Sequence, residues 1–304
     1  MRLRGLALAV SVALLVAGCD GGGAALPKTP TTPLNTLTSA ATPSAATTGS
    51  ASAVPMPVGD IPGWHQIFTD DFQTDIPVGG FSGCQNDTAR TCTGLPPSVS
   101  AKWWAYPDGW TDTSGKGTYM PSKTISIGDG AMHLHLYTDN GVHMVAAPVP
   151  KLPNPVGGEG GQLYGRYAIR FMVQRPTADF KLAWLLWPDT EKFPANGEID
   201  FPEGGLDGNI AAFMHHQNGV SQYDQDQYNT TVPVSSGWHT AVTEWTAASC
   251  RFILDGTTVG TSASRIPDTP MHWIIQSETA LDGAISNTAT GDIYLAWVAI
   301  YRPA

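Results

Sequence analysis

From residue 63 onward the sequence is a series of short runs in which apolar and polar residues alternate, separated by Gly, Pro, Asn and Asp. This alternation places every second side chain on one face, which is the period of a β-strand. No long run has the helical period of 3.6 residues. Many strands and few helices predict an all-β sandwich or barrel, and the segment is long enough for one domain of two packed antiparallel sheets. The predicted strands are Trp64–Phe68, Thr124–Ile127, Met132–Tyr137, Leu163–Val173, Phe180–Trp187, Glu198–Phe201, Asn209–His216, Trp238–Trp245, Cys250–Leu254, Met271–Ser277 and Ile293–Arg302.

One predicted strand concentrates acidic residues, because Glu198, Asp200 and Glu203 fall within a single hexapeptide. Glu198 and Asp200 are two positions apart and share a strand face, whereas Glu203 is out of phase. A β-bulge at Pro202, a residue type tolerated at bulges, would restore the phase. We therefore expect three carboxylates on one face. A solvated acidic strand face is the alternative explanation of this motif taken alone.

Three crowded carboxylates suit the cleavage of a glycosidic bond. Like charges raise the pKa of at least one of them, which can then act as a general acid beside a carboxylate. On a flat strand, Cα atoms four positions apart are about 13 Å from each other, whereas a retaining pair of carboxyl groups is about 5 Å apart. The chemistry therefore requires a strand curved toward a concave cleft.

Residues 1–18 have the layout of a secretory signal, with Arg2 and Arg4, then the apolar run Leu6–Val16, then small residues. The run is too short to span a membrane. The ending before Cys19 resembles the lipobox of bacterial lipoproteins, which implies a lipidated Cys19 on the extracellular side of the bacterial cell membrane. An ordinary signal peptide cut elsewhere is the alternative.

Residues 19–62 are dominated by Gly, Ala, Pro, Ser and Thr and hold few large apolar residues. Such a segment cannot bury enough surface to fold, so we expect a flexible tether. A low-complexity remnant without a role fits the composition equally well. Residues 63–304 are then one catalytic domain.

Charge and cysteine usage fit an exported protein that acts on sugar. Cys84 and Cys92 flank a polar loop, which favours a local disulfide, while Cys250 lies in an apolar strand pattern and is expected to be a buried thiol. The formal net charge of −10 argues against a nucleic acid partner. A neutral sugar polymer fits this charge better than a sulfated or uronic one.

Tryptophan and histidine supply candidates for sugar binding, since aromatic faces stack on sugar rings. Trp103, Trp104 and Trp110 cluster in a loop-like segment, which favours a surface role. His215 and His216 follow the acidic strand at the distance of a hairpin, and at most one of them can face a cleft. Neighbouring strand residues diverge, so we expect no metal at this pair.

The acidic hexapeptide resembles the E-x-D-x-x-E signature of glycoside hydrolase family 16, in the β-bulge form found in laminarinases, agarases and carrageenases. Further segments resemble the family's strands in the same order: Gly165–Arg170, Leu182–Leu186, Gly237–Thr240, Arg251–Gly256 and Ala296–Tyr301. The resemblance covers about residues 63–303. It implies a β-jelly roll with a concave substrate cleft.

The resemblance also implies roles for single residues. Glu198 corresponds to the nucleophile of a retaining mechanism, Asp200 to its orienting partner and Glu203 to the acid/base. Trp184 corresponds to a tryptophan that stacks on a sugar, and one histidine of the 215–216 pair to a cleft histidine. Gln276 stands near the position where laminarinases usually have an asparagine, a departure that leaves the substrate open.

The sequence therefore predicts a monomeric, lipid-anchored, endo-acting glycoside hydrolase of a β-linked polysaccharide, with β-1,3-glucan as the first choice. A transglycosylase would use the same residues. A lectin-like carbohydrate-binding protein is the alternative outside enzymes, but binding alone does not require three crowded acids. No cofactor is expected to be required. A structural calcium ion is common in the family, and Asp292 is a possible ligand for it.

Overall fold

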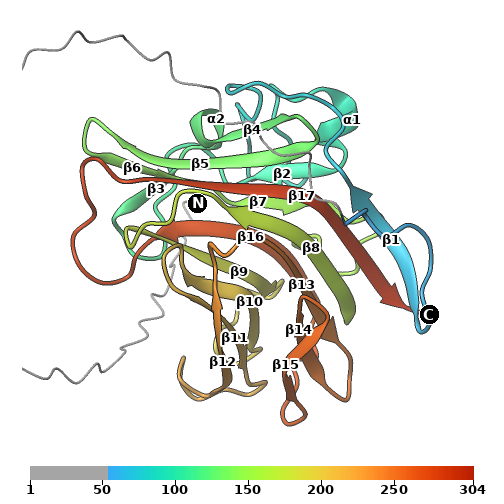
Figure 1. The fold of residues 1–304 in the computed structure, drawn as a ribbon. Helices are drawn as coiled ribbons and strands as arrows, with labels where there is room; N and C mark the ends of the chain where they lie inside the picture. The colour runs from blue at the N-terminus through green and yellow to red at the C-terminus, as the bar shows by residue number, and fades with distance from the viewer. Residues whose placement is uncertain (1–53) are drawn as a thin grey trace, which may run out of the picture.

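A computed structural model describes residues 54–304, which form a nearly all-β structure (Figure 1). The two short helices are α1 (Pro97–Ser100) and α2 (Pro121–Thr124). The strands are β1 (Trp64–Asp70), β2 (Trp103–Ala105), β3 (Gly117–Tyr119), β4 (Ile125–Gly128), β5 (Ala131–Asp139), β6 (Val142–Val145), β7 (Pro148–Pro150), β8 (Gly165–Val173), β9 (Phe180–Pro188), β10 (Glu198–Gly205), β11 (Asn209–His215), β12 (Gln225–Pro233), β13 (Trp238–Trp245), β14 (Cys250–Leu254), β15 (Thr257–Ser262), β16 (Met271–Thr279) and β17 (Thr290–Pro303).

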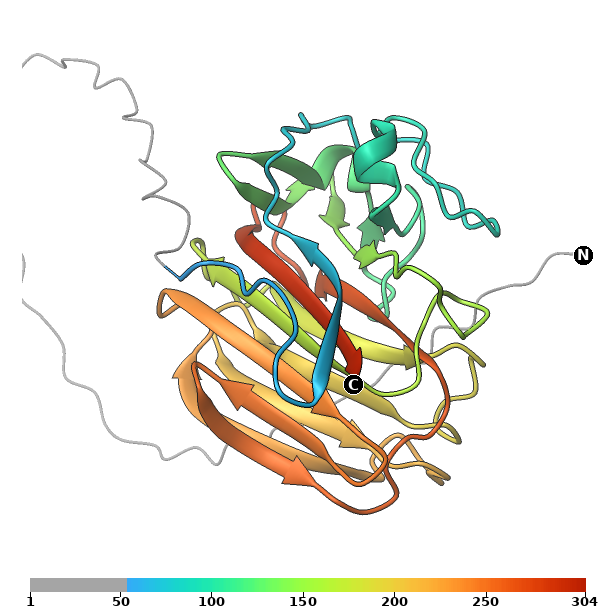
Figure 2. The ribbon, with the colours of Figure 1, turned by 90° about the vertical axis from the view of Figure 1, so that its right-hand side faces the viewer.

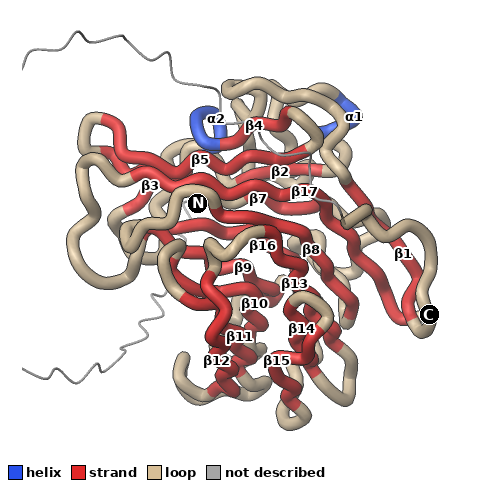
Figure 3. The backbone as a smooth tube through the Cα atoms, in the orientation of Figure 1, coloured by secondary structure: helices blue, strands red, loops and turns tan. Residues whose placement is uncertain are grey.

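Two sheets make up the body of the protein, as Figures 2 and 3 show, and their strands pair antiparallel except for the parallel pair β3–β6. A ten-stranded sheet has the order β15-β14-β13-β8-β17-β5-β6-β3, with β1 added to β17 and β4 added to β5. A five-stranded sheet has the order β12-β11-β10-β9-β16, and β2 and β7 form a small third sheet. The predicted jelly-roll sandwich is confirmed.

The core lies between the two large sheets, where the apolar residues of each alternating strand meet. Phe171 of β8 contacts Trp184 of β9 edge to face, with ring centroids 4.9 Å apart. Phe201 of β10 contacts Phe252 of β14 in the same way at 5.4 Å. Both pairs join the ten-stranded sheet to the five-stranded one, so the inward face of β10 is apolar.

All eleven predicted strands overlap strands of the structure. The Asp255-Gly256 turn joins β14 to β15, with φ of 49° and 81° at the two residues, as its Asp-Gly signal predicts. Strand β12 was not predicted, because its sequence Gln-Asp-Gln-Tyr-Asn-Thr-Thr-Val-Pro is largely polar. It is an edge strand of the five-stranded sheet, where polar residues on both faces are tolerated.

The folded region begins earlier than the predicted boundary at residue 63. Met56 and Ile61 pack against an apolar cluster that contains Trp297, and the Trp297 indole donates a hydrogen bond to the Val54 carbonyl oxygen at 3.0 Å. Residues 54–62 therefore belong to the domain and not to a tether. The predicted signal, Cys19 and the tether up to residue 53 lie outside the described residues.

The cysteines of the described region pair as predicted. Cys84 and Cys92 form a disulfide across a separation of eight residues. Cys250 is a free, buried thiol, and burial raises its pKa well above the ordinary value. Within residues 54–304, no helix is long and apolar enough to cross a membrane.

Candidate active site

Strand β10 carries the three carboxylates and contains the predicted bulge. Asp200 pairs with Leu185 of β9, and Glu203 pairs with Ala183. The partners are two positions apart, whereas Asp200 and Glu203 are three apart, so one extra residue is accommodated beside Pro202. The register with β11 shifts at the same place. Asp200 and Glu203 therefore share a face despite their odd spacing.

The carboxylates point away from the ten-stranded sheet. Ile199 and Phe201, which alternate with Glu198 and Asp200, belong to the apolar core between the sheets. Successive strand residues face opposite ways. We call the outer face of the five-stranded sheet, which carries Glu198, Asp200 and Glu203, the carboxylate face.

The side chains beside each carboxylate differ in size. Bulky residues flank Glu198 and Asp200, whereas alanines flank Glu203. Glu198 lies between Trp187 of β9 and His215 of β11, and Asp200 lies between Leu185 and Phe213. Glu203 lies between Ala183 of β9 and Ala211 of β11. The first two carboxylates are consequently enclosed, whereas the side chain of Glu203 is 15% exposed.

Burial sets the charge state of Glu198 and Asp200, which are only 5% and 4% exposed. Burial raises the pKa of Glu198 well above the usual range, and the neighbouring charges of Asp200 and Glu203 raise it further. The pKa of Asp200 is also raised by burial, against the opposing effect of His215. Among the described residues, neither Glu198 Oε2 nor Asp200 Oδ2 has a hydrogen-bond donor at good distance and angle. The two groups therefore resist being ionised together.

His215 is the histidine that lies on the carboxylate face. Its Nε2 is 3.3 Å from Asp200 Oδ2 and 3.8 Å from Glu198 Oε2. His216 instead contacts Asp224, with its Nδ1 2.9 Å from Oδ1. The expectation that at most one of the two histidines joins the carboxylates is confirmed. Three potential ligand atoms, one from each of Glu198, Asp200 and His215, lie within 4.8 Å of one another. A metal ion could also bridge atoms at this spacing.

Glu203 pairs with Lys181 of β9, which sequence reasoning missed. Lys181 Nζ donates to Glu203 Oε1 at 2.8 Å. Burial alone would lower the pKa of Lys181, but the charges of Glu203 and Glu278 raise it above the ordinary value, so it stays protonated. The sequence did contain a signal for this pair. Lys181 is two residues before Ala183, and the two-residue period of a strand puts Lys181 and Ala183 on the same face, the carboxylate face.

Glu278 at the end of β16 connects this face to the loop before β3. Its Oε1 accepts hydrogen bonds from the Tyr119 hydroxyl at 2.8 Å and from the Thr113 hydroxyl at 2.6 Å. Burial raises the pKa of Glu278, and Lys181 opposes that shift. The loop that contains Trp110 is thus fixed beside Lys181 and Glu203.

Comparison with known families identifies the segment that holds these carboxylates. Residues 157–299 match the model of glycosyl hydrolases family 16. Over this segment, which contains Glu198, Asp200 and Glu203, the chain is similar to family 16 glycosyl hydrolases. A sequence comparison with curated proteins found no match.

Solved structures share the fold at low sequence identity. The laminarinase of Rhodothermus marinus superposes with a TM-score of 0.60 at 18% identity, covering 79% of this chain and 98% of the other. The catalytic domain of an endo-1,3-β-glucanase of Thermotoga petrophila gives 0.57 at 15% identity, covering 81% and 99%. A structure described with endo-acting O-glycanases of the human gut microbiota that initiate mucin breakdown gives 0.59 at 19% identity, covering 81% and 94%.

The family 16 resemblance places the sugar-stacking tryptophan of β9 at Trp184, and the structure contradicts this. Trp184 is fully buried against Phe171 in the core. Its strand neighbours Ala183 and Leu185 lie on the carboxylate face, so Trp184 between them points to the opposite face, into the core. Trp187 is the tryptophan of β9 on the carboxylate face. Its indole donates to Glu191 Oε2 at 3.0 Å.

The predicted surface role of Trp103 and Trp104 is also wrong. Both are buried in the core, at 0% and 2% exposure. Their indoles donate inward, from Trp103 to Asp70 Oδ2 at 2.8 Å and from Trp104 to the Gln85 carbonyl at 2.9 Å. They belong to strand β2 and not to a loop. That strand has only three residues, which is too short to show an alternating pattern in the sequence.

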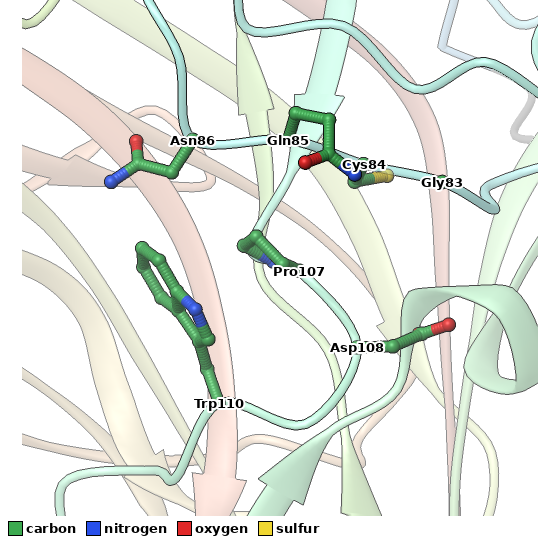
Figure 4. A pocket seen from close by; sticks show the side chains of 7 residues that line it. All are labelled: Gly83, Cys84, Gln85, Asn86, Pro107, Asp108 and Trp110. Atoms are coloured by element: carbon green, nitrogen blue, oxygen red, sulfur yellow. The ribbon is translucent and has the colours of Figure 1, made fainter.

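Trp110, the third member of that cluster, is 39% exposed and borders a hollow of about 380 Å³ (Figure 4). Asn86, Gln85 and Asp108 supply polar groups to the lining. The Trp110 ring contacts Tyr106 at 5.3 Å between centroids. Gln276 lies on the carboxylate face, paired with Ala183 across the β9–β16 register.

Proposed function

We propose that this β-sandwich is a family 16 glycoside hydrolase, retaining and endo-acting, that cleaves a β-linked polysaccharide. The observation that carries the proposal is the bulged strand β10, which brings Glu198, Asp200 and Glu203 to one face with Glu198 and Asp200 buried. A retaining mechanism needs one carboxylate that attacks the anomeric carbon and one carboxyl group that protonates the leaving oxygen.

Glu198 is the nucleophile in this proposal, and it must be ionised when it attacks. Asp200 lies beside it, and the pKa of Asp200 is also raised. Asp200 can therefore hold the proton that Glu198 gives up. His215, 3.3 Å from Asp200, orients that carboxyl group from the adjacent strand. Attack forms a covalent bond between Glu198 and the anomeric carbon and breaks the bond to the leaving oxygen.

Glu203 is the acid/base. In the first step it gives its proton to the leaving oxygen, and in the second it takes a proton from the water that releases the sugar from Glu198. Lys181 occupies Oε1 of Glu203, which leaves Oε2 for the reacting oxygen.

Aromatic and amide side chains around the carboxylates would hold the sugar. Trp187 lies next to Glu198, and Gln276 lies next to Ala183, beside Glu203. Trp110 offers a partly exposed ring beside the amides of Gln85 and Asn86, a combination suited to stacking and hydroxyl recognition. We assign Trp110 to a sugar farther from the cleaved bond.

β-1,3-Glucan is the first substrate choice, because laminarinases are among the structural relatives. The gut O-glycanase relative makes mucin-type glycans the second choice to test. Transglycosylation uses the same residues and differs in whether a sugar hydroxyl or water reacts with the intermediate. The protein should therefore be screened on laminarin, mixed-linkage glucan and mucin O-glycans, with and without a chelator.

Replacement of Glu203 by Ala tests the mechanism. A polysaccharide leaving group needs protonation, so its cleavage should fall by about two to four orders of magnitude. An activated aryl glycoside leaves without a proton and should still form the intermediate. Azide needs no base, so it should restore turnover and give a β-glycosyl azide. An α-azide, or equal losses on both substrates without azide rescue, would contradict the assignment.

We further propose that a lipid on Cys19 anchors the protein on the extracellular side of the cell membrane, with residues 20–53 as a tether. The support is the residue pattern before Cys19. The Cys19→Ala variant should lose its membrane association, and fractionation followed by detection of the protein measures this. A Cys19→Ala variant that stays in the membrane fraction would exclude lipid anchoring at this residue.

A further inference from the structure

A second cluster of potential ligands lies on the far side of the sandwich from the carboxylate face. His133 and His135 are on β5, and Asp292 is on the adjacent strand β17, directly opposite His135 in the register. Leu134 and Leu136, which alternate with the histidines, are buried in the core. The three polar side chains therefore project from the outer face of the ten-stranded sheet, whose strands β5 and β17 run side by side in Figure 1.

Both imidazoles converge on one carboxylate oxygen. His133 Nε2 is 2.7 Å and His135 Nδ1 is 2.8 Å from Asp292 Oδ1. The three atoms lie within 4.8 Å of one another. Asp292 is 1% exposed, whereas the histidine side chains are 27% and 33% exposed. An ion could reach the cluster from solvent while the carboxylate stays shielded.

Stacking on tyrosines holds the histidine rings in place. His133 lies flat on Tyr294, with centroids 4.4 Å apart and an interplanar angle of 2°. His135 stacks on Tyr137 at 4.7 Å and 21°. Both tyrosines come from the same two strands. The rings are thus oriented before any ligand binds, which lowers the entropic cost of binding.

The donor set distinguishes between metal ions. Calcium takes six to eight oxygen ligands, so two imidazoles do not fit the structural calcium expected at Asp292. Two imidazole nitrogens and one carboxylate oxygen suit zinc, with water as a fourth ligand. Arg175 contacts Oδ2 of Asp292, which leaves Oδ1 as the single ligating oxygen.

We propose that His133 Nε2, His135 Nδ1 and Asp292 Oδ1 bind one zinc ion that joins β5 to β17. Ligand atoms around a tetrahedral zinc are roughly 3.3 Å apart, given bond lengths of about 2.0 to 2.1 Å. The present nitrogen–oxygen distances therefore open by about half an ångström. In the zinc-bound form each neutral imidazole carries its proton on the other ring nitrogen, and the lone pair of the nitrogen that now faces Oδ1 binds the zinc ion. This site is independent of the proposed hydrolase activity.

Titration of the full-length, untagged chain with zinc, in competition with a chromophoric chelator, tests the proposal. We expect one equivalent to bind and the melting temperature to rise with zinc concentration. His133→Gln and His135→Gln should each weaken binding by at least about tenfold. His143→Gln is the matched control, because His143 lies on the neighbouring strand β6 and bonds only Thr138 among the described residues. His215→Gln tests the competing cluster at Glu198 and Asp200.

Unchanged binding in the His133→Gln/His135→Gln double variant, or loss of binding in His215→Gln alone, would place the ion elsewhere and overturn the proposal. Absence of saturable binding in the wild type would overturn it as well. Cobalt(II) gives a readout that does not depend on the folding of a variant. The wild-type protein should show the intense visible bands of four-coordinate cobalt, and only the weak bands of six-coordinate cobalt would contradict a site of this geometry.

Discussion

Replacing Glu198 with Gln should abolish turnover and at the same time stabilise the fold at neutral pH. Glu198 is 5% exposed, its Oε2 has no hydrogen-bond partner among the described residues, and Asp200 and Glu203 repel its charge. The neutral amide removes the repulsion and can donate a hydrogen bond toward Asp200. It cannot form the glycosyl-enzyme bond, so hydrolysis should be lost while sugar binding remains.

The size of the stabilisation follows from the unsatisfied oxygen. A buried polar group without a partner costs about 1 to 3 kcal/mol, more if charged. Recovery of that amount raises the free energy of unfolding by about 1 to 3 kcal/mol. For a domain of this size, the melting temperature then rises by about 2 to 4 °C per kcal/mol.

The gain should depend on pH with a definite sign. The pKa of Glu198 is raised in the folded protein above its unfolded value of 4.5, so the folded state binds the proton more tightly. Wild-type stability therefore falls as the pH rises from 4.5 through the raised pKa, and this term is absent in the Gln variant. The variant should be more stable at pH 7, and the difference should shrink toward pH 4.

Calorimetry or guanidinium unfolding at pH 7 and at pH 4.5 measures the effect. Glu203→Gln is the matched control, because Glu203 is paired with Lys181 and its neutralisation should destabilise the protein. A Glu198→Gln protein that is less stable than wild type at pH 7, or whose gain is equal at both pH values, would refute this account of the buried carboxylate.

Two further predictions concern the residues around the carboxylates. Lys181→Met leaves Glu203 among carboxylates without its cation, so the free energy of unfolding, measured with urea at pH 7, should fall by about 2 to 3 kcal/mol. The control Lys181→Arg should retain most of the stability. An unchanged free energy of unfolding in Lys181→Met would mean that the pair contributes nothing. Trp187→Ala should raise KM roughly fivefold, equivalent to about 1 kcal/mol of stacking, with little change in melting temperature. Trp184→Ala should instead destabilise the fold by about 3 to 5 kcal/mol, and a reversed pattern would show that the two tryptophans have been assigned to the wrong faces.

Local pattern in the sequence was enough to predict the fold class and the grouping of the carboxylates. The two-residue period gives the face of each residue relative to its strand neighbours, and Pro202 gave a reason for a bulge between Asp200 and Glu203. The Asp255-Gly256 hairpin and the disulfide of Cys84 with Cys92 rest on equally local signals. Each of these features depends on residues that are close together in the chain.

Only the tertiary structure decided which face of each strand meets the other sheet. Trp184 and Trp187 are three positions apart and so face opposite ways, but the pattern within β9, apolar on both faces, does not say which one is inside. The pairing of Lys181 with Glu203 and the choice of His215 over His216 depend on the register between β9, β10 and β11. Register is set by contacts between residues far apart in sequence, and a shift by one residue would exchange the two faces.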